Sequence, residues 1–132
     1  MKPGEALPSA RFAFSDAQVA QYASLSRDDN PIHVDEAAAR AVGLPGRIVH
    51  GMLLVTAFER LVRDWRDDIV ILEMSARFVR PVLVGEYVTV GGRVAALRKE
   101  PAQGAVLRLL ARDREGKIVC VGDAGVVQST GS

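Results

Sequence analysis

An apolar segment at residues 51–64 constrains the fold of this chain more than any other feature. Its apolar spacing is helical, and its first half has almost no polar face, so a helix here needs to be buried. Four strand-like stretches follow it, at residues 69–80, 84–97, 105–113 and 117–128. A helix ahead of consecutive strands predicts an α+β domain, in which a curled antiparallel sheet wraps around the long central helix.

The connections between these stretches have the residues of turns and irregular strand positions. Residues 113–116, Asp-Arg-Glu-Gly, are compatible with a hairpin, and Pro81 interrupts the first stretch. The pair Gly91-Gly92 predicts a bulge or a sharp curl inside the second stretch. These interruptions favour a curled sheet over a flat one.

Two short helices are expected ahead of the apolar one. Residues 11–14 alternate like a short strand, and Ser15 with Gln18 then has the spacing of a helix capping box. A second helix is predicted between Asp35, as its N-cap, and Gly43, as its terminating glycine. The first half of the chain is therefore mainly helical.

The composition fits one globular domain and excludes several classes of partner. With 132 residues and 48% hydrophobic content, we expect a single domain over residues 1–132, ending in a flexible polar tail at 129–132. The 17 basic and 16 acidic side chains nearly cancel, so no nucleic-acid partner is expected. No apolar run is long enough for a signal peptide or a membrane span, which predicts a cytoplasmic protein with no membrane partner. The single cysteine, Cys120, lies between valines and is expected to pack in the core.

The segment that points to chemistry contains one carboxylate and one histidine around a proline. Asp28 and His33 stand five residues apart, and Pro31 between them prevents a continuous helix. Asn30 and Pro31 together predict a fixed bend, which could bring the carboxylate and the imidazole together. Taken singly, Asp28 is compatible with a solvated charge at a helix end, and His33 with a polar residue in a loop.

Three segments of the chain resemble one known family. Residues 28–33, Asp-Asp-Asn-Pro-Ile-His, match the hydratase motif Asp-x-Asn-Pro-x-His at every fixed position. The second segment is residues 48–53, Ile-Val-His-Gly-Met-Leu, and the third is residues 78–82, Phe-Val-Arg-Pro-Val, which lead into Val-Gly-Glu at 84–86. In these segments the chain resembles the MaoC-like dehydratases, the family of (R)-specific enoyl-CoA hydratases. One departure is Arg27, which stands where this family often has glycine.

The resemblance implies a fold, an activity and an assembly. The fold would be the hot-dog fold, a sheet wrapped around a central helix. The activity would be that of a hydro-lyase, which hydrates trans-2-enoyl-CoA to 3-hydroxyacyl-CoA or catalyses the reverse dehydration. The assembly would be a homodimer, with the acyl-CoA thioester substrate bound near the subunit interface.

Hydration of such a thioester needs a nucleophilic oxygen at the β-carbon, a proton at the α-carbon and stabilisation of charge on the carbonyl oxygen. The resemblance assigns the first two functions to Asp28 and His33, which would hold one water between them and add it in syn fashion. The N-terminus of the helix near Gly51 presents free backbone N–H groups, so we expect Gly51, with Met52 as a neighbour, to bind the carbonyl oxygen. This chemistry requires no metal and no redox cofactor.

Two other functions remain open from the sequence. Hot-dog proteins also include acyl-CoA thioesterases that use a carboxylate on the central helix, for which Glu59 is the candidate here. A non-catalytic subunit that binds acyl thioesters would also keep this fold. His50, just before the buried helix, could orient the active loop or simply bond a backbone carbonyl, and we expect the structural role. For Arg47 we expect a solvated position rather than contact with the phosphates of coenzyme A. A metal site made of Asp28 and the two histidines lacks the spacing of a ligand motif.

Overall fold

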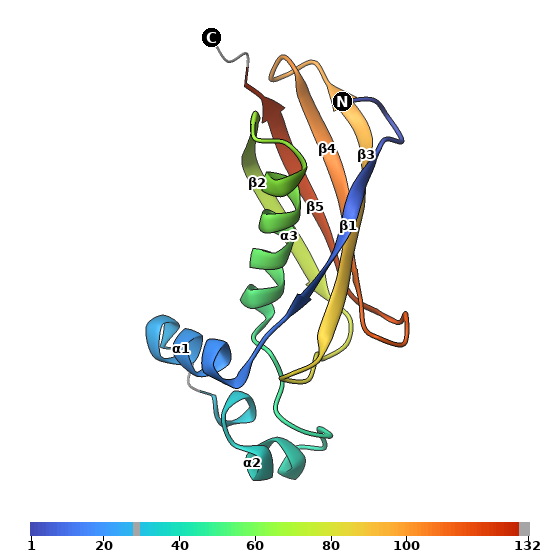
Figure 1. Ribbon diagram of the computed structural model, residues 1–132. Helices are drawn as coiled ribbons and strands as arrows, with labels where there is room; N and C mark the ends of the chain where they lie inside the picture. The colour runs from blue at the N-terminus through green and yellow to red at the C-terminus, as the bar shows by residue number, and fades with distance from the viewer. Residues whose placement is uncertain (28–29, 130–132) are drawn as a thin grey trace.

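The structure, a computed structural model, describes residues 1–27 and 30–129 and packs one long helix against one face of a five-stranded sheet (Figure 1). The strands are β1 (Ala6–Ala13), β2 (Ile69–Phe78), β3 (Tyr87–Arg98), β4 (Gly104–Arg112) and β5 (Ile118–Gln128). Their spatial order is β1-β3-β4-β5-β2, and all neighbouring strands are antiparallel. The long helix is α3 (Gly51–Trp65), preceded by α1 (Asp16–Ser26), the 3₁₀ turn η1 (Pro31–His33) and α2 (Glu36–Ala41). The predicted antiparallel sheet around a central helix is therefore confirmed.

One face of α3 is buried against the inner face of the sheet. Its buried side chains follow helical spacing and are Leu54, Ala57, Phe58, Leu61 and Val62. Met52, in the first turn, is 55% exposed. The expected burial of the whole first half of the helix is therefore wrong for Met52, because the sheet covers only one side of α3.

The bulge predicted at Gly91-Gly92 lies on the facing strand. Both glycines pair regularly with β4, whereas β1 has an irregularity between Leu7 and Ala10, opposite Gly91. Pro8 is part of this irregularity, and proline, which cannot donate to a strand ladder, is tolerated on an edge strand such as β1. The same break explains why only residues 11–14 show strand alternation, although β1 begins at Ala6.

Local signals in the sequence correspond closely to the ends of helices and turns. Ser15 and Gln18 form the predicted capping box, with N···O distances of 2.8 and 3.2 Å. The Asp35 carboxylate accepts two backbone N–H groups at the start of α2, and Gly43 has φ +89° beyond its end. The backbone N–H of Gly116 donates to the carbonyl of Asp113 at 2.9 Å, which confirms the predicted hairpin.

The C-terminal end of the described chain is held beside the start of β2. The backbone N–H of Ser129, the first residue of the predicted tail, donates to the carbonyl of Asp68 at 2.6 Å. Residues 130–132 of that tail lie outside the described residues. None of the described helices is long and apolar enough to cross a membrane. Cys120 is buried, as expected, on the inner face of the sheet.

Candidate active site

α1 and α2 gather near the end of the sheet at which α3 begins (Figure 1), and His33 ends the 3₁₀ turn η1, which lies between those two helices in the chain. The side-chain oxygen of Asn30 accepts the backbone N–H of Ile32 at 3.2 Å, and Pro31 occupies the first position of η1. The predicted bend at Asn30-Pro31 is therefore confirmed. His33 ends this turn and is only 7% exposed. Asp28 lies outside the described residues, so its pairing with His33 remains a prediction.

The backbone of Ile48 holds His33 in place. Its N–H donates to the carbonyl of Ile32 at 3.1 Å, and its carbonyl oxygen lies 2.8 Å from Nδ1 of His33. Because a carbonyl oxygen can only accept, Nδ1 must carry a proton in this contact. In the neutral imidazole, Nε2 is therefore the nitrogen left to accept a proton from a reactant.

Three aromatic rings from separate segments pack together beside this contact. The rings of His33 and His50 are stacked, with centroids 3.7 Å apart and an interplanar angle of 22°. Tyr22 of α1 packs edge-on against His50, with ring centroids 4.8 Å apart and an interplanar angle of 63°. His50 is 1% exposed, which agrees with the structural role expected for it.

The first turn of α3 offers backbone donors at the same place. His50 is the N-cap of α3, and its side chain makes no capping hydrogen bond. The N–H groups of Gly51 and Met52 occupy the first two helical positions, where no carbonyl within the helix can accept them. These groups and the helix dipole favour an anionic oxygen at this end of α3.

A cavity of about 350 Å³ brings the imidazole and the helix end together. Its lining includes His33, Gly51, Leu54 and residues 78–82. The side chain of Met52 is exposed and is not part of the lining that the described residues form. Of the predicted site residues, His33 and Gly51 therefore line the same cavity. Met52 can take part only through its backbone N–H group.

Phe78 begins the third segment of the family resemblance, but the sequence assigned it no role in the site. A Cβ atom built on Gly51 would lie 2.7 Å from Cζ of Phe78, so the phenyl ring lies directly against the glycine. A side chain at this position would require the ring of Phe78, which is 48% exposed, to move aside. Alternation along β2 does place Phe78 on the inner face with Met74 and Ala76, but nothing in the sequence predicts its contact with Gly51.

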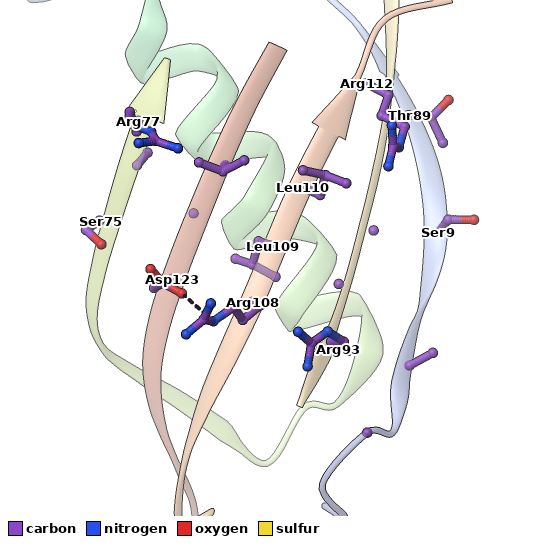
Figure 2. A pocket seen from close by; sticks show the side chains of 17 residues that line it. Ser9, Ser75, Arg77, Thr89, Arg93, Arg108, Leu109, Leu110, Arg112 and Asp123 are labelled. Atoms are coloured by element: carbon purple, nitrogen blue, oxygen red, sulfur yellow. Dashed lines mark ion pairs between the residues drawn. The ribbon is translucent and has the colours of Figure 1, made fainter. Parts of the chain in front are cut away.

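A larger hollow, of about 970 Å³, lies on the opposite, outer face of the sheet (Figure 2). Strand register places Gly91, Leu110 and Val121 in one row across its floor. Around them stand Arg77, Arg93, Arg108 and Arg112, with Asp123 as the carboxylate among the described lining residues.

The charged side chains of this outer hollow are spread around its rim. Arg108 pairs with Asp123 at 3.4 Å, and the four arginines do not point towards a common centre (Figure 2). The described lining contains neither histidine nor cysteine. Arginine stays protonated in proteins, so this hollow offers no group that exchanges protons near neutral pH.

Neither Glu59 nor Arg47 is among the described lining residues of the inner cavity. Glu59 follows Gly51 by eight positions in α3, which places it about 12 Å further along the helix axis. Arg47 forms an ion pair with Asp16. Within residues 1–27 and 30–129, no three histidine, cysteine or acidic side chains are grouped to hold a metal ion. The alternative metal site that includes Asp28 lies partly outside this range.

Arg27 keeps a backbone conformation that usually requires glycine. It is the C-cap of α1 and has φ 61° and ψ 16°, in the left-handed region. Side chains other than glycine and asparagine rarely occupy this region at a helix end. The departure from the family's frequent glycine therefore changes the residue type but not the turn at the end of α1.

Comparison with known proteins agrees with this architecture. Among solved structures, an (R)-hydratase from Aeromonas caviae superposes with a TM-score of 0.89 and 34% identity, over 97% of each chain. A second, R-hydratase PhaJ1 from Pseudomonas aeruginosa, superposes with a TM-score of 0.87 and 24% identity, over 98% of this chain and 83% of the other. These likenesses confirm the expected hot-dog fold, with a sheet that is curled but not closed.

Sequence relatives and a family model identify the group to which the chain belongs. The (R)-specific enoyl-CoA hydratase of Aeromonas caviae is 40% identical over 89 residues, covering 66% of each protein. A mitochondrial 3-hydroxyacyl-[acyl-carrier-protein] dehydratase of Arabidopsis thaliana is 34% identical over 99 residues, covering 75% of this chain and 59% of the plant protein. The chain thus matches less than two thirds of the length of either relative. Residues 2–106 match the family model described as MaoC like domain, and the chain belongs to that family.

Proposed function

We propose that this protein adds water to the double bond of a trans-2-enoyl thioester, or removes water from the (3R)-3-hydroxyacyl thioester. The observation that carries the proposal is the inner cavity, where His33 and the N-terminus of α3 lie together. The names of the two sequence relatives support the reaction type, since one is a hydratase and the other a dehydratase. Their carriers differ, and we propose coenzyme A as the carrier here.

His33 is the proposed proton-transfer group. Its Nδ1 proton is held by the carbonyl of Ile48, which leaves Nε2 to take a proton from the attacking water. Asp28, in its proposed role, accepts the second hydrogen bond of that water and orients it. The water oxygen then bonds to the β-carbon while a proton is returned to the α-carbon on the same face, which gives syn addition.

The backbone of α3 supplies the proposed oxyanion site. As water adds, negative charge develops on the thioester oxygen, and the N–H of Gly51 donates to it, with the N–H of Met52 as a second donor. One such preorganised donor is worth about 10²- to 10³-fold in rate. Water adds across the double bond without net oxidation or reduction, and the backbone N–H groups stabilise the developing charge. The proposed reaction therefore needs no metal and no redox cofactor, and coenzyme A enters as part of the substrate.

We also propose that the protein is a homodimer paired through β2. This strand ends the sheet, so one side of its backbone ladder has no neighbouring strand within the described chain. Large exposed apolar side chains gather on or beside it: Val70, Leu72, Phe78 and Val79. A second copy would cover them and would place Phe78, which lines the cavity, at the subunit boundary. Size-exclusion chromatography with light scattering should give twice the 14.2 kDa chain mass, and a monomer would contradict the pairing.

The cytoplasmic location stays a prediction.

Crotonyl-CoA is the substrate that tests the proposed reaction. The absorbance of the conjugated double bond and the release of free thiol should be followed in parallel with the purified protein. Hydration removes the absorbance without releasing thiol, whereas the thioesterase alternative based on Glu59 releases thiol. Thiol release without hydration, or binding with no turnover of crotonyl-CoA and longer enoyl-CoA substrates, would contradict the proposal.

A further inference from the structure

We infer that His50 is a positioning residue, which holds the imidazole of His33 in the plane needed for proton transfer. The inference rests on the proposed function of His33. His50 itself is 1% exposed and is absent from the described lining of the inner cavity, although both His33 and Gly51 line it. Its effect on the reaction therefore passes through its neighbours.

The hydrogen bond to Ile48 does not by itself orient the imidazole of His33. One hydrogen bond tolerates a range of distances and angles, so the two side-chain torsions of His33 keep some freedom while Nδ1 stays bonded. The outer torsion of a histidine side chain has only broad preferences, so a second contact is needed to fix the plane. The nearly parallel stack on His50, at 3.7 Å and 22°, provides that contact and so sets the direction of Nε2.

Two features of the described chain restrain His50: a ring contact with Tyr22 and its backbone position at the start of α3. Tyr22 contacts it edge-on, and its backbone begins α3 as the N-cap. That position usually favours serine, threonine, aspartate or asparagine, whose side chains accept a backbone N–H of the first turn. The His50 side chain makes no such bond, and its ring stacks on His33 instead.

The stack also links the two halves of the proposed machinery. Gly51, the proposed oxyanion donor, follows His50 directly in the chain. A ring fixed at the N-cap therefore sets where the imidazole of His33 stands relative to the first N–H of α3. Displacement of a reacting group by about 1 Å can cost about 100-fold in rate, so this spacing matters for turnover.

A leucine and a phenylalanine at position 50 separate this role from general packing. For crotonyl-CoA, we expect His50→Leu to lower kcat by about 10- to 100-fold with KM changed by less than about 3-fold, because the plane of His33 is lost. His50→Phe keeps a flat ring in the stack and should retain kcat within about 3-fold of the unsubstituted protein. Wild-type kcat in the leucine variant would overturn the inference.

Nuclear magnetic resonance gives a readout that does not depend on activity. The chain has two histidines, so in either variant at position 50 the only imidazole signals belong to His33. A stacked ring shifts those signals upfield in the phenylalanine variant, and the leucine variant should lose this shift. If His50→Phe keeps the upfield shift but loses as much kcat as His50→Leu, a nitrogen of His50 is what matters and the stacking role is wrong.

The same experiment distinguishes failure of this inference from failure of the proposed function. An unsubstituted protein without hydratase activity would refute the function, whereas the imidazole signals would still report whether the stack fixes His33. Should His50→Leu not fold, Tyr22→Leu and Tyr22→Phe test the ring contacts from a half-buried position. Only Tyr22→Leu should lower kcat several-fold, and equal kcat in both variants would overturn the inference.

Discussion

The inner cavity beside α3 and the outer hollow across the sheet differ in volume, about 350 against about 970 Å³, and in the groups that line them. The inner one holds a histidine with a defined tautomer beside the N-terminus of a helix. The outer one is larger but holds arginines, which cannot give up a proton near neutral pH. The candidate active site is therefore identified by a group that can exchange protons, and not by the volume of the hollow.

The two regions meet at the end of β2, where successive side chains point to opposite faces of the sheet. Phe78 lines the inner cavity, and Arg77 lines the outer hollow. Substitutions on the two faces should therefore have separable effects.

The largest expected difference concerns turnover. His33→Ala should lower kcat/KM for crotonyl-CoA by about 10²- to 10⁴-fold, the usual contribution of a positioned acid or base, without unfolding the protein. Asp28→Asn should cause a loss in the same range if it shares the water. Arg93→Ala, on the outer face, should leave kcat/KM within about 2-fold, since surface arginines make little contribution to chemistry on the other face. A comparable loss in the arginine variant would break the distinction between the two hollows.

Much of this architecture follows from local patterns in the sequence. The long helix, the four later strands and the capping residues Ser15 and Asp35 depend on contacts within a few positions of the chain, and these predictions are confirmed. Pro31 likewise predicts the bend that ends with His33. Such features could be read before the fold because proline, capping and alternation act locally.

The rest of the site depends on contacts between distant segments. The bond from His33 to Ile48 and the contact of Phe78 with Gly51 join residues 15 and 27 positions apart. The stack of His33 on His50 is of the same kind. No periodic pattern encodes which distant side chains meet, so the sequence predicted site roles for His33 and Gly51 and none for Phe78.

A pair of glycine substitutions tests the same contrast in stability. Gly51→Ala should lower the free energy of unfolding by about 1 kcal/mol, because the partly exposed ring of Phe78 must move away from the new Cβ. At Gly91 of the outer hollow, the nearest atom to a new Cβ is Cβ of Ser9 at 3.7 Å, so Gly91→Ala should change stability by less than about 0.5 kcal/mol. Denaturant unfolding measures both. Adding Phe78→Ala should remove most of the effect at Gly51, and equal losses at the two glycines would contradict this packing.

Alkaline pH tests burial on the inner face. Burial raises the pKa of Cys120, which pairs across the strands with Phe78, to about 11 from 9.0. Below pH 9 the thiol is protonated in both the folded and unfolded states, and its contribution to stability is fully present. Between pH 9 and 11 only the unfolded state ionises, so stability should fall by about 1–2 kcal/mol. Urea unfolding of the unsubstituted protein and Cys120→Ala should show this extra slope only with the thiol present; identical slopes would contradict it.

The smallest expected effect lies on the outer face. Arg108 and Asp123 form an ion pair with side chains 64% and 56% exposed, so Asp123→Asn should cost less than about 1 kcal/mol. The loss should shrink further in high salt, because salt screens exposed charges. Thermal unfolding at low and high salt measures it, with kcat for crotonyl-CoA unchanged. A large loss, or a fall in kcat, would show that the outer face supports the inner one.

Hydration of crotonyl-CoA in D₂O, with the product examined by nuclear magnetic resonance, tests most directly the claim that one water is added from the cavity beside His33. We expect (3R)-3-hydroxybutyryl-CoA with one deuterium at C2, on the face that received the hydroxyl, and no comparable product from His33→Ala. A product deuterated without stereochemical preference, or full hydration by His33→Ala, would contradict it.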